Sequence, residues 1–178
     1  MATTAVVVGE VSLEQRIHRL SKLDLEPIKY KLVHEEGWTI DRADKVEVEY
    51  KKFLVLVLKN RVTRTVRSIV PTKEIDQFWH NHILDTIKYA SDCEFYFGFF
   101  LHHFPYLGLR GPEDAQVLQD QFRESQAFYK AEFGEGKVTN DKAICTSCGT
   151  SNCAPTPSCG GDPSPTIDNH IRPVLARV

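Results

Sequence analysis

Two histidines stand two residues apart in the segment Trp79-His80-Asn81-His82. If this segment is helical, each residue advances by about 100°, so the imidazoles of His80 and His82 point to different sides of the helix. They cannot bind one metal ion together from a straight helix. The spacing instead places His80 beside Asp76, one turn earlier, whose carboxylate can fix the tautomer of the imidazole.

The predicted face of His82 carries a run of polar side chains. These are Asp85, Thr86, Tyr89 and Cys93. A second histidine pair, His102-His103, follows a turn expected at Gly98, and one of its imidazoles can complete a site if the chain folds back there. We therefore expect a metal pocket with candidate ligands His80, His82, Asp85, Cys93, His102 and His103, supported by Asp76, Trp79 and Tyr89. Such nitrogen, oxygen and sulfur ligands suit zinc, iron or copper without selecting among them.

The same residues allow two alternatives. A histidine within an apolar helix is often a hydrogen-bonded core residue, and the protein is then a non-catalytic interaction or regulatory module. In that case the aromatic segment from Phe95 to Tyr106 is the candidate surface for a protein partner. The other alternative is a metal-dependent enzyme, since open coordination positions are a precondition of metal catalysis. No phosphate-binding loop, G-x-S-x-G elbow or H-E-x-x-H motif is present, so catalytic residues and substrate stay unassigned.

Four thiols lie close together near the carboxyl end of the chain. They are Cys145, Cys148, Cys153 and Cys159, spaced C-x2-C-x4-C-x5-C in a stretch rich in Pro, Gly, Ser and Thr. Four thiolates on such a chain can hold zinc or an iron-sulfur centre, although the spacing matches no common framework. Disulfides formed on oxidation and thiols without a role are the two alternatives.

The elements that must position these groups are predicted to be helical. The expected helices are Ser12 to Lys22, Asp24 to Gly37, Arg42 to Asn60, Lys73 to Ala90, a short continuation to Phe97 capped by Ser91 or Asp92, and Glu113 to Phe133 after Pro112. Residues 42–60 alternate like a strand around Val48, but their length and lack of Gly and Pro favour a helix. The part from Phe53 to Leu58 is apolar on all sides and is expected at the centre of the domain.

We therefore expect an all-α fold, a single compact bundle of about five to six helices with an irregular carboxyl-terminal tail containing Cys, Pro and Gly. The predicted division is an extension at 1–11, a helical domain at 12–136 and the cysteine-bearing tail at 137–178. A chain of 178 residues with 42% hydrophobic content can close one core without disulfides.

Composition argues against several classes of partner. The 22 basic and 24 acidic residues leave a formal charge of −2, with no basic block suited to phosphates, so no nucleic-acid partner is expected. The longest aliphatic run is far shorter than the roughly 20 residues of a membrane-spanning helix. The start of the chain lacks the pattern of a signal peptide, so we expect a soluble cytoplasmic protein without a membrane partner.

A longer pattern resembles a known family. The string from Pro71 to His82, followed by Tyr89, Asp92-Cys93 and Phe100 to Pro105, is similar to the glycine-rich domain-containing protein-like family, with its D-x-x-W-H-x-H and Y-x-x-D-C hallmarks. The similarity covers residues 54–111. It implies a helical fold and a role for Asp76, Trp79, His80, His82, Tyr89 and Cys93. It names no reaction, and this chain has no glycine-rich block.

Overall fold

The computed structural model of the protein describes residues 11–66 and 68–134. Within these ranges it contains six α-helices, one π-helical turn and no β-strand. The elements are α1 (Leu13–Leu20), α2 (Glu26–Glu35), α3 (Ile40–Thr63), α4 (Lys73–Leu84), α5 (Thr86–Asp92), the π-helical turn η1 (Cys93–Phe97) and α6 (Pro112–Phe133). The predicted all-α fold is confirmed. The predicted cysteine-bearing tail lies outside the described residues.

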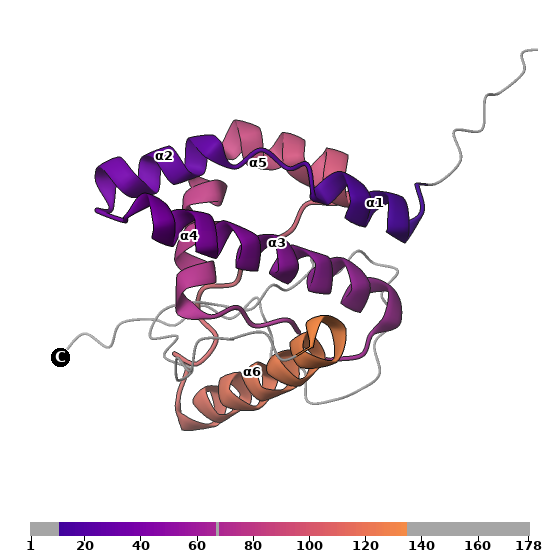
Figure 1. Ribbon diagram of the computed structural model, residues 1–178. Helices are drawn as coiled ribbons and strands as arrows, with labels where there is room; N and C mark the ends of the chain where they lie inside the picture. Colours follow the sequence, from indigo (N-terminus) through magenta and orange to yellow (C-terminus); the bar gives the residue numbers. More distant parts are fainter. Residues whose placement is uncertain (1–10, 67, 135–178) are drawn as a thin grey trace, which may run out of the picture.

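The long helix α3 runs through the middle of the molecule, with α1, α2 and α5 on one side and α6 on the other, while α4 crosses near its start (Figure 1). It contacts α1, α2 and α4. Thr39 caps it by accepting a hydrogen bond from the Arg42 amide, and Arg64 ends it in the left-handed conformation with φ 52°. A helix here, rather than a strand, agrees with the prediction from length.

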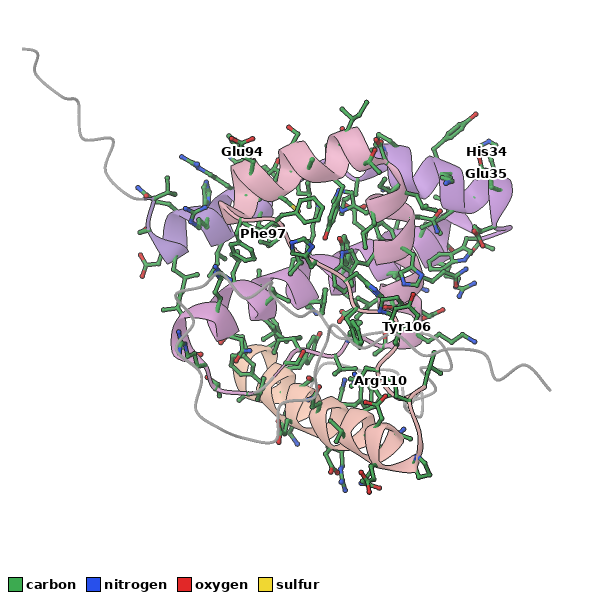
Figure 2. All side chains as sticks on the ribbon, turned by 180° about the vertical axis from the view of Figure 1, so that it is seen from behind. His34, Glu35, Glu94, Phe97, Tyr106 and Arg110 are labelled. Carbon is green, nitrogen blue, oxygen red and sulfur yellow. The ribbon has the colours of Figure 1, made fainter. Side chains whose placement is uncertain are left out.

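The apolar half of α3 lies in the core, as predicted. Its buried residues there are Phe53, Leu54, Leu56, Val57 and Leu58. The side chains of α1, α2, α4 and η1 pack around them, and Phe97 points inward from η1 while Glu94 lies on the outer surface (Figure 2). Burial of this apolar surface provides the main driving force for folding.

The amino-terminal helices begin largely as predicted. Ser12 caps α1 in a capping box with Gln15. The expectation that Asp24 caps α2 is wrong by one position, because Leu25 occupies the cap position and no side chain caps the helix there. The Asp24 carboxylate instead accepts a hydrogen bond from the Glu26 amide.

The helix predicted for residues 73–90 is two helices. Asp85, with φ −83° and ψ 74°, interrupts it between Leu84 and Thr86. Its carboxylate accepts a hydrogen bond from the Lys88 amide and so caps α5. Aspartate favours this arrangement because its short side chain competes with helical backbone hydrogen bonding.

The continuation predicted to start with a cap at Ser91 or Asp92 also needs correction. No side chain caps it, because α5 passes directly into the π-helical turn η1. Gly98 ends this turn with φ 73°, as predicted, and a Cβ there would lie 2.5 Å from the Arg16 guanidinium. The chain then turns back towards α4.

Polar contacts attach α6 to the rest of the fold. Tyr129 donates a hydrogen bond to Glu49 and accepts one from Lys52, and Lys59 pairs with Glu132. A cavity of about 880 Å³ lies between α3, α6 and the segment before α4. None of the helices in residues 11–66 and 68–134 is long and apolar enough to cross a membrane.

The central position of α3 makes a direct prediction about stability. Phe53→Ala removes a ring that is 3% exposed and packs on Trp79, so it is expected to lower the free energy of unfolding by about 3–5 kcal/mol. Val48→Ala, on the exposed side of the same helix, should change it by less than about 0.5 kcal/mol. Urea unfolding followed by circular dichroism measures both, and equal losses would contradict this description of the core.

Candidate metal site

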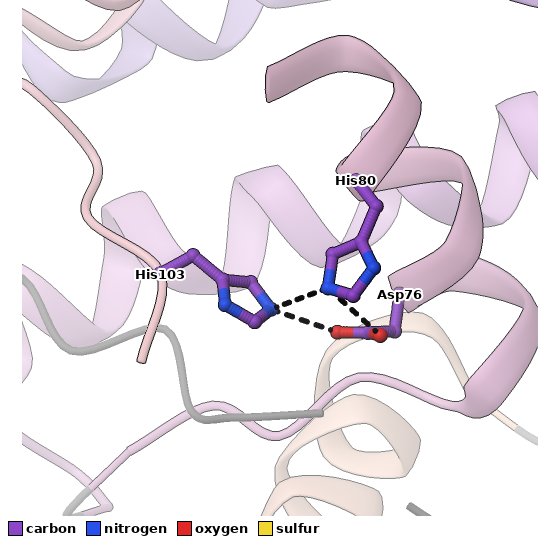
Figure 3. A group of neighbouring side chains, drawn as sticks. All are labelled: Asp76, His80 and His103. Atoms are coloured by element: carbon purple, nitrogen blue, oxygen red, sulfur yellow. Dashed lines mark hydrogen bonds and ion pairs between the residues drawn. The ribbon is translucent and has the colours of Figure 1, made fainter. Parts of the chain in front are cut away.

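Three side chains that can bind a metal meet where α4 faces the segment after η1. Asp76 and His80 lie one turn apart on α4, and His103 comes from the non-helical segment that follows Gly98 (Figure 3). The Nε2 atoms of His80 and His103 are 3.0 Å apart. His103 Nε2 lies 3.1 Å from Asp76 Oδ1, and His80 Nε2 lies 3.3 Å from Asp76 Oδ2. The three side chains thus direct ligand atoms at one another.

The beginning of α4 explains how Asp76 is placed. Thr72 caps the helix through a hydrogen bond from the Ile75 amide, and Glu74 and Asp76 occupy the first turn, where the helix dipole favours negative charge. Because helical residues four apart lie on one face, Asp76 presents its carboxylate to the imidazole of His80.

The burial of the three residues is graded. The side chain of Asp76 is 0% exposed, that of His103 is 8% exposed and that of His80 is 39% exposed. Among the described residues, Asp76 Oδ2 has no hydrogen-bond partner, because His80 Nε2 is near it but not aligned for a hydrogen bond. A buried carboxylate oxygen without a partner is costly, so this group is incomplete as it stands.

The electrostatics of His80 reflect the same setting. Burial lowers the pKa of the imidazole, the Asp76 carboxylate opposes that effect, and the neighbouring His103 adds to it, so the pKa lies below its ordinary value. This setting favours the neutral form of the His80 imidazole. Neutral imidazole is the form that binds metal ions.

The interatomic distances suit a single metal ion. With metal–ligand bonds of about 2.1 Å, adjacent ligand atoms lie about 3.0 Å apart in octahedral geometry and about 3.4 Å apart in tetrahedral geometry. The separation of 3.0 Å between the two Nε2 atoms falls in this range, as do 3.1 Å from His103 to Asp76 Oδ1 and 3.3 Å from His80 to Asp76 Oδ2. Two imidazoles and one carboxylate can thus take three adjacent positions around an ion and leave others open.

His82 leaves α4 on another side and lies in a separate buried network. Its Nδ1 is 2.9 Å from the hydroxyl of Tyr50, and its Nε2 is 2.9 Å from the carboxylate of Asp92. Lys88 also pairs with Asp92, at 2.9 Å. Both ring nitrogens of His82 are occupied by protein groups, and its side chain is 1% exposed.

Charge pairing controls the ionisation of Asp92. Burial by itself raises the pKa of this carboxyl, but hydrogen bonds from His82 and Lys88 outweigh burial, and the pKa lies below its ordinary value. Neither Tyr50 nor Asp92 was predicted as a partner of His82. Their sequence separations from it, 32 and 10 residues, correspond to no local motif, although Asp92 belongs to the Y-x-x-D-C string.

The other predicted ligands are placed elsewhere. Asp85 caps α5, and the exposed ring of His102 packs on Phe100. Cys93 is 1% exposed beside Tyr89, and burial raises the pKa of its thiol although the neighbouring Leu101 backbone and Tyr89 side chain act to lower it. The structure brings none of the three into the group formed by Asp76, His80 and His103. The four predicted thiolate ligands lie outside the described residues: Cys145, Cys148, Cys153 and Cys159.

The aromatic segment considered as a partner surface is divided between core and surface. Phe97, Leu101 and Phe104 are buried, whereas Phe95 is 56% exposed and Phe100 is 45% exposed. Much of this segment therefore serves to hold the chain that carries His103 against the domain.

Comparison with known proteins agrees with the resemblance seen in the sequence. Residues 15–130 match the UCP032817-like family, and this range includes the site described above and all the helices except the first residues of α1 and the last residues of α6. The chain belongs to this family. It is also 33% identical over 85 residues to glycine-rich domain-containing protein 1 of Arabidopsis thaliana, a match that covers 48% of this chain and 10% of that protein. No solved structure matches the chain.

The two histidines of α4 should differ in their effect on stability. His82→Ala leaves Tyr50 and Asp92 without the imidazole between them, so we expect the free energy of unfolding to fall by about 3 kcal/mol. His80→Ala removes a half-buried ring and should cost less than about 1 kcal/mol. Urea unfolding of both variants measures the two losses. An equal loss of stability in His80→Ala and His82→Ala would show that His82 is not the more important of the two for the fold.

Asp92 predicts an acid-dependent part of stability. Because its pKa is lower in the folded protein, its ionised form stabilises the fold above the unfolded-state pKa of about 3.9, and this stabilisation is lost as the pH falls through the folded-state pKa. Between about pH 5 and pH 2, the melting temperature of the wild type should therefore fall more steeply than that of Asp92→Asn. Parallel melting curves against pH for the two proteins would show that Asp92 makes no such contribution.

Proposed function

We propose that this chain binds a divalent transition-metal ion through Asp76, His80 and His103. The observation that carries the proposal is the completely buried carboxylate of Asp76, with one oxygen lacking a hydrogen bond and two imidazole nitrogens within 3.3 Å. A cation at this point would bind the carboxylate and both imidazoles at once, which no single proton can do.

The arrangement of His80 and His103 supports the same conclusion. Their Nε2 atoms face each other at 3.0 Å, so one nitrogen must carry a proton for the pair to be attractive in the metal-free protein. That proton leaves Asp76 Oδ2 unsatisfied. A metal ion replaces it and accepts lone pairs from all three residues.

The ligand types limit the choice of ion. Two imidazoles and a carboxylate without a thiolate suit zinc and iron, and copper accepts the same groups. Three protein ligands leave coordination positions open, as in catalytic rather than structural zinc sites. The partial exposure of His80 supplies a route from solvent to the ion, so a metal-dependent enzyme is the second candidate function.

Metal titration tests the proposal. Protein prepared without a histidine tag and stripped with chelator should bind one equivalent of Zn²⁺ or Co²⁺ at this site, with a rise in melting temperature. Asp76→Asn, His80→Ala and His103→Ala should each weaken metal binding by about 100-fold or more. Loss of a residue that only orients a ligand typically costs about 10- to 100-fold, and loss of the ligand itself should cost at least as much. His102→Ala, next to His103 but with its ring on Phe100, is the matched control and should bind like the wild type.

The thiols near the carboxyl end must be separated from this measurement. Titrations are therefore repeated with Cys145, Cys148, Cys153 and Cys159 all replaced by serine, because clustered thiolates bind zinc by themselves. One equivalent should still bind. If the serine variant binds no metal, or if His102→Ala weakens binding as much as His103→Ala, the proposed site is wrong.

A further inference from the structure

His103 lies outside any helix, so something other than helical geometry must hold it against Asp76 and His80. Buried residues flank it on both sides: Phe104, directly after it, is 4% exposed, and Leu101, two residues earlier, is 0% exposed. Leu101 is also attached through its backbone. Its carbonyl accepts a hydrogen bond from the hydroxyl of Tyr89 on α5. The backbone that leads into His103 is thereby attached to a different helix from the one that carries the other two ligands.

Tyr89 is in turn attached to α4. Its hydroxyl oxygen accepts a hydrogen bond of 3.0 Å from Nε1 of Trp79, and both side chains are nearly or fully buried. The single hydroxyl therefore uses its proton on Leu101 and a lone pair on Trp79. Buried tyrosine and tryptophan usually satisfy their polar atoms, and here they do so through each other.

Trp79 completes the connection to the site. Its ring packs edge-on against the imidazole of His103, with ring centroids 4.6 Å apart, and it is the residue directly before His80. Leu101 thus fixes the backbone before His103, and Trp79 packs against the ring of His103. Both Leu101 and Trp79 are hydrogen-bonded to the Tyr89 hydroxyl.

We propose that Tyr89 is a positioning residue for the metal site, which sets the backbone and the ring of His103 through Leu101 and Trp79. The inference rests on the proposed metal binding by Asp76, His80 and His103. Without the hydroxyl, the Leu101 carbonyl and the Trp79 indole both lose their buried partner, and the segment carrying His103 is released while Asp76 and His80 remain on α4. Groups that orient metal ligands in this way typically contribute 10- to 100-fold to metal affinity.

The test is Co²⁺ binding to Tyr89→Phe, because the visible spectrum of Co²⁺ reports how its ligands are arranged. The variant is made in the background with the four carboxyl-terminal cysteines replaced by serine and is measured well below its melting temperature. Tyr89→Phe should bind Co²⁺ about 10- to 100-fold more weakly than the parent, with an altered spectrum. Tyr96→Phe, which removes a hydroxyl from η1 near the same helix end, is the matched control and should leave affinity and spectrum unchanged.

A metal-free measurement separates this inference from the proposed function. Hydrogen exchange of the backbone amides at 101–104 should be faster in Tyr89→Phe than in Tyr96→Phe, whether or not metal binds. If Tyr89→Phe folds poorly, Trp79→Phe removes the other hydrogen bond of the same hydroxyl and should shift both readouts in the same direction. If Tyr89→Phe has the same exchange rates, Co²⁺ affinity and spectrum as the parent protein, the positioning role is wrong and the proposed metal binding stands. A parent protein that binds no Co²⁺ would overturn the proposed function and this inference together.

Discussion

Because α4 turns by about 100° per residue, the imidazoles of His80 and His82 leave it on different sides, and each needs polar partners in a largely apolar interior. His82 finds them in Tyr50 of α3 and Asp92 of α5. His80 finds Asp76 on its own helix and His103 on the returning chain. The packing of α4 between α3, α5 and that chain therefore depends on where these two rings point.

Two buried carboxylates show how similar chemistry serves different purposes. The carboxylate of Asp92 is hydrogen-bonded to His82 and paired with Lys88, and these contacts lower its pKa. Asp76 is more deeply buried, yet one of its oxygens has no hydrogen-bond partner among the described residues. The first arrangement is complete and contributes to the fold. The second has room in its coordination for a cation, which is why the metal proposal rests on Asp76 and not on Asp92.

The helical elements were largely predictable because the signals for them are local. Ser12 and Gly98 each set a helix end through their immediate neighbours. The helix at residues 42–60 follows from the length of a continuous segment without Gly or Pro. The break at Asp85 was not predicted, because an aspartate inside an apolar helical pattern can remain in the helix or cap the next one. Tertiary packing decides between these two outcomes, since residues on either side of the break must face different neighbours.

The amino-acid sequence is enough to show that His80 and His82 cannot share an ion on a straight helix and that Asp76 lies beside His80, because both conclusions follow from the helical period. It could offer only a set of candidates for the third ligand. Folding places His103, rather than His102, Asp85 or Cys93, beside His80. That choice depends on the turn after η1 and on contacts between residues more than 20 positions apart, and neither leaves a periodic pattern in the sequence.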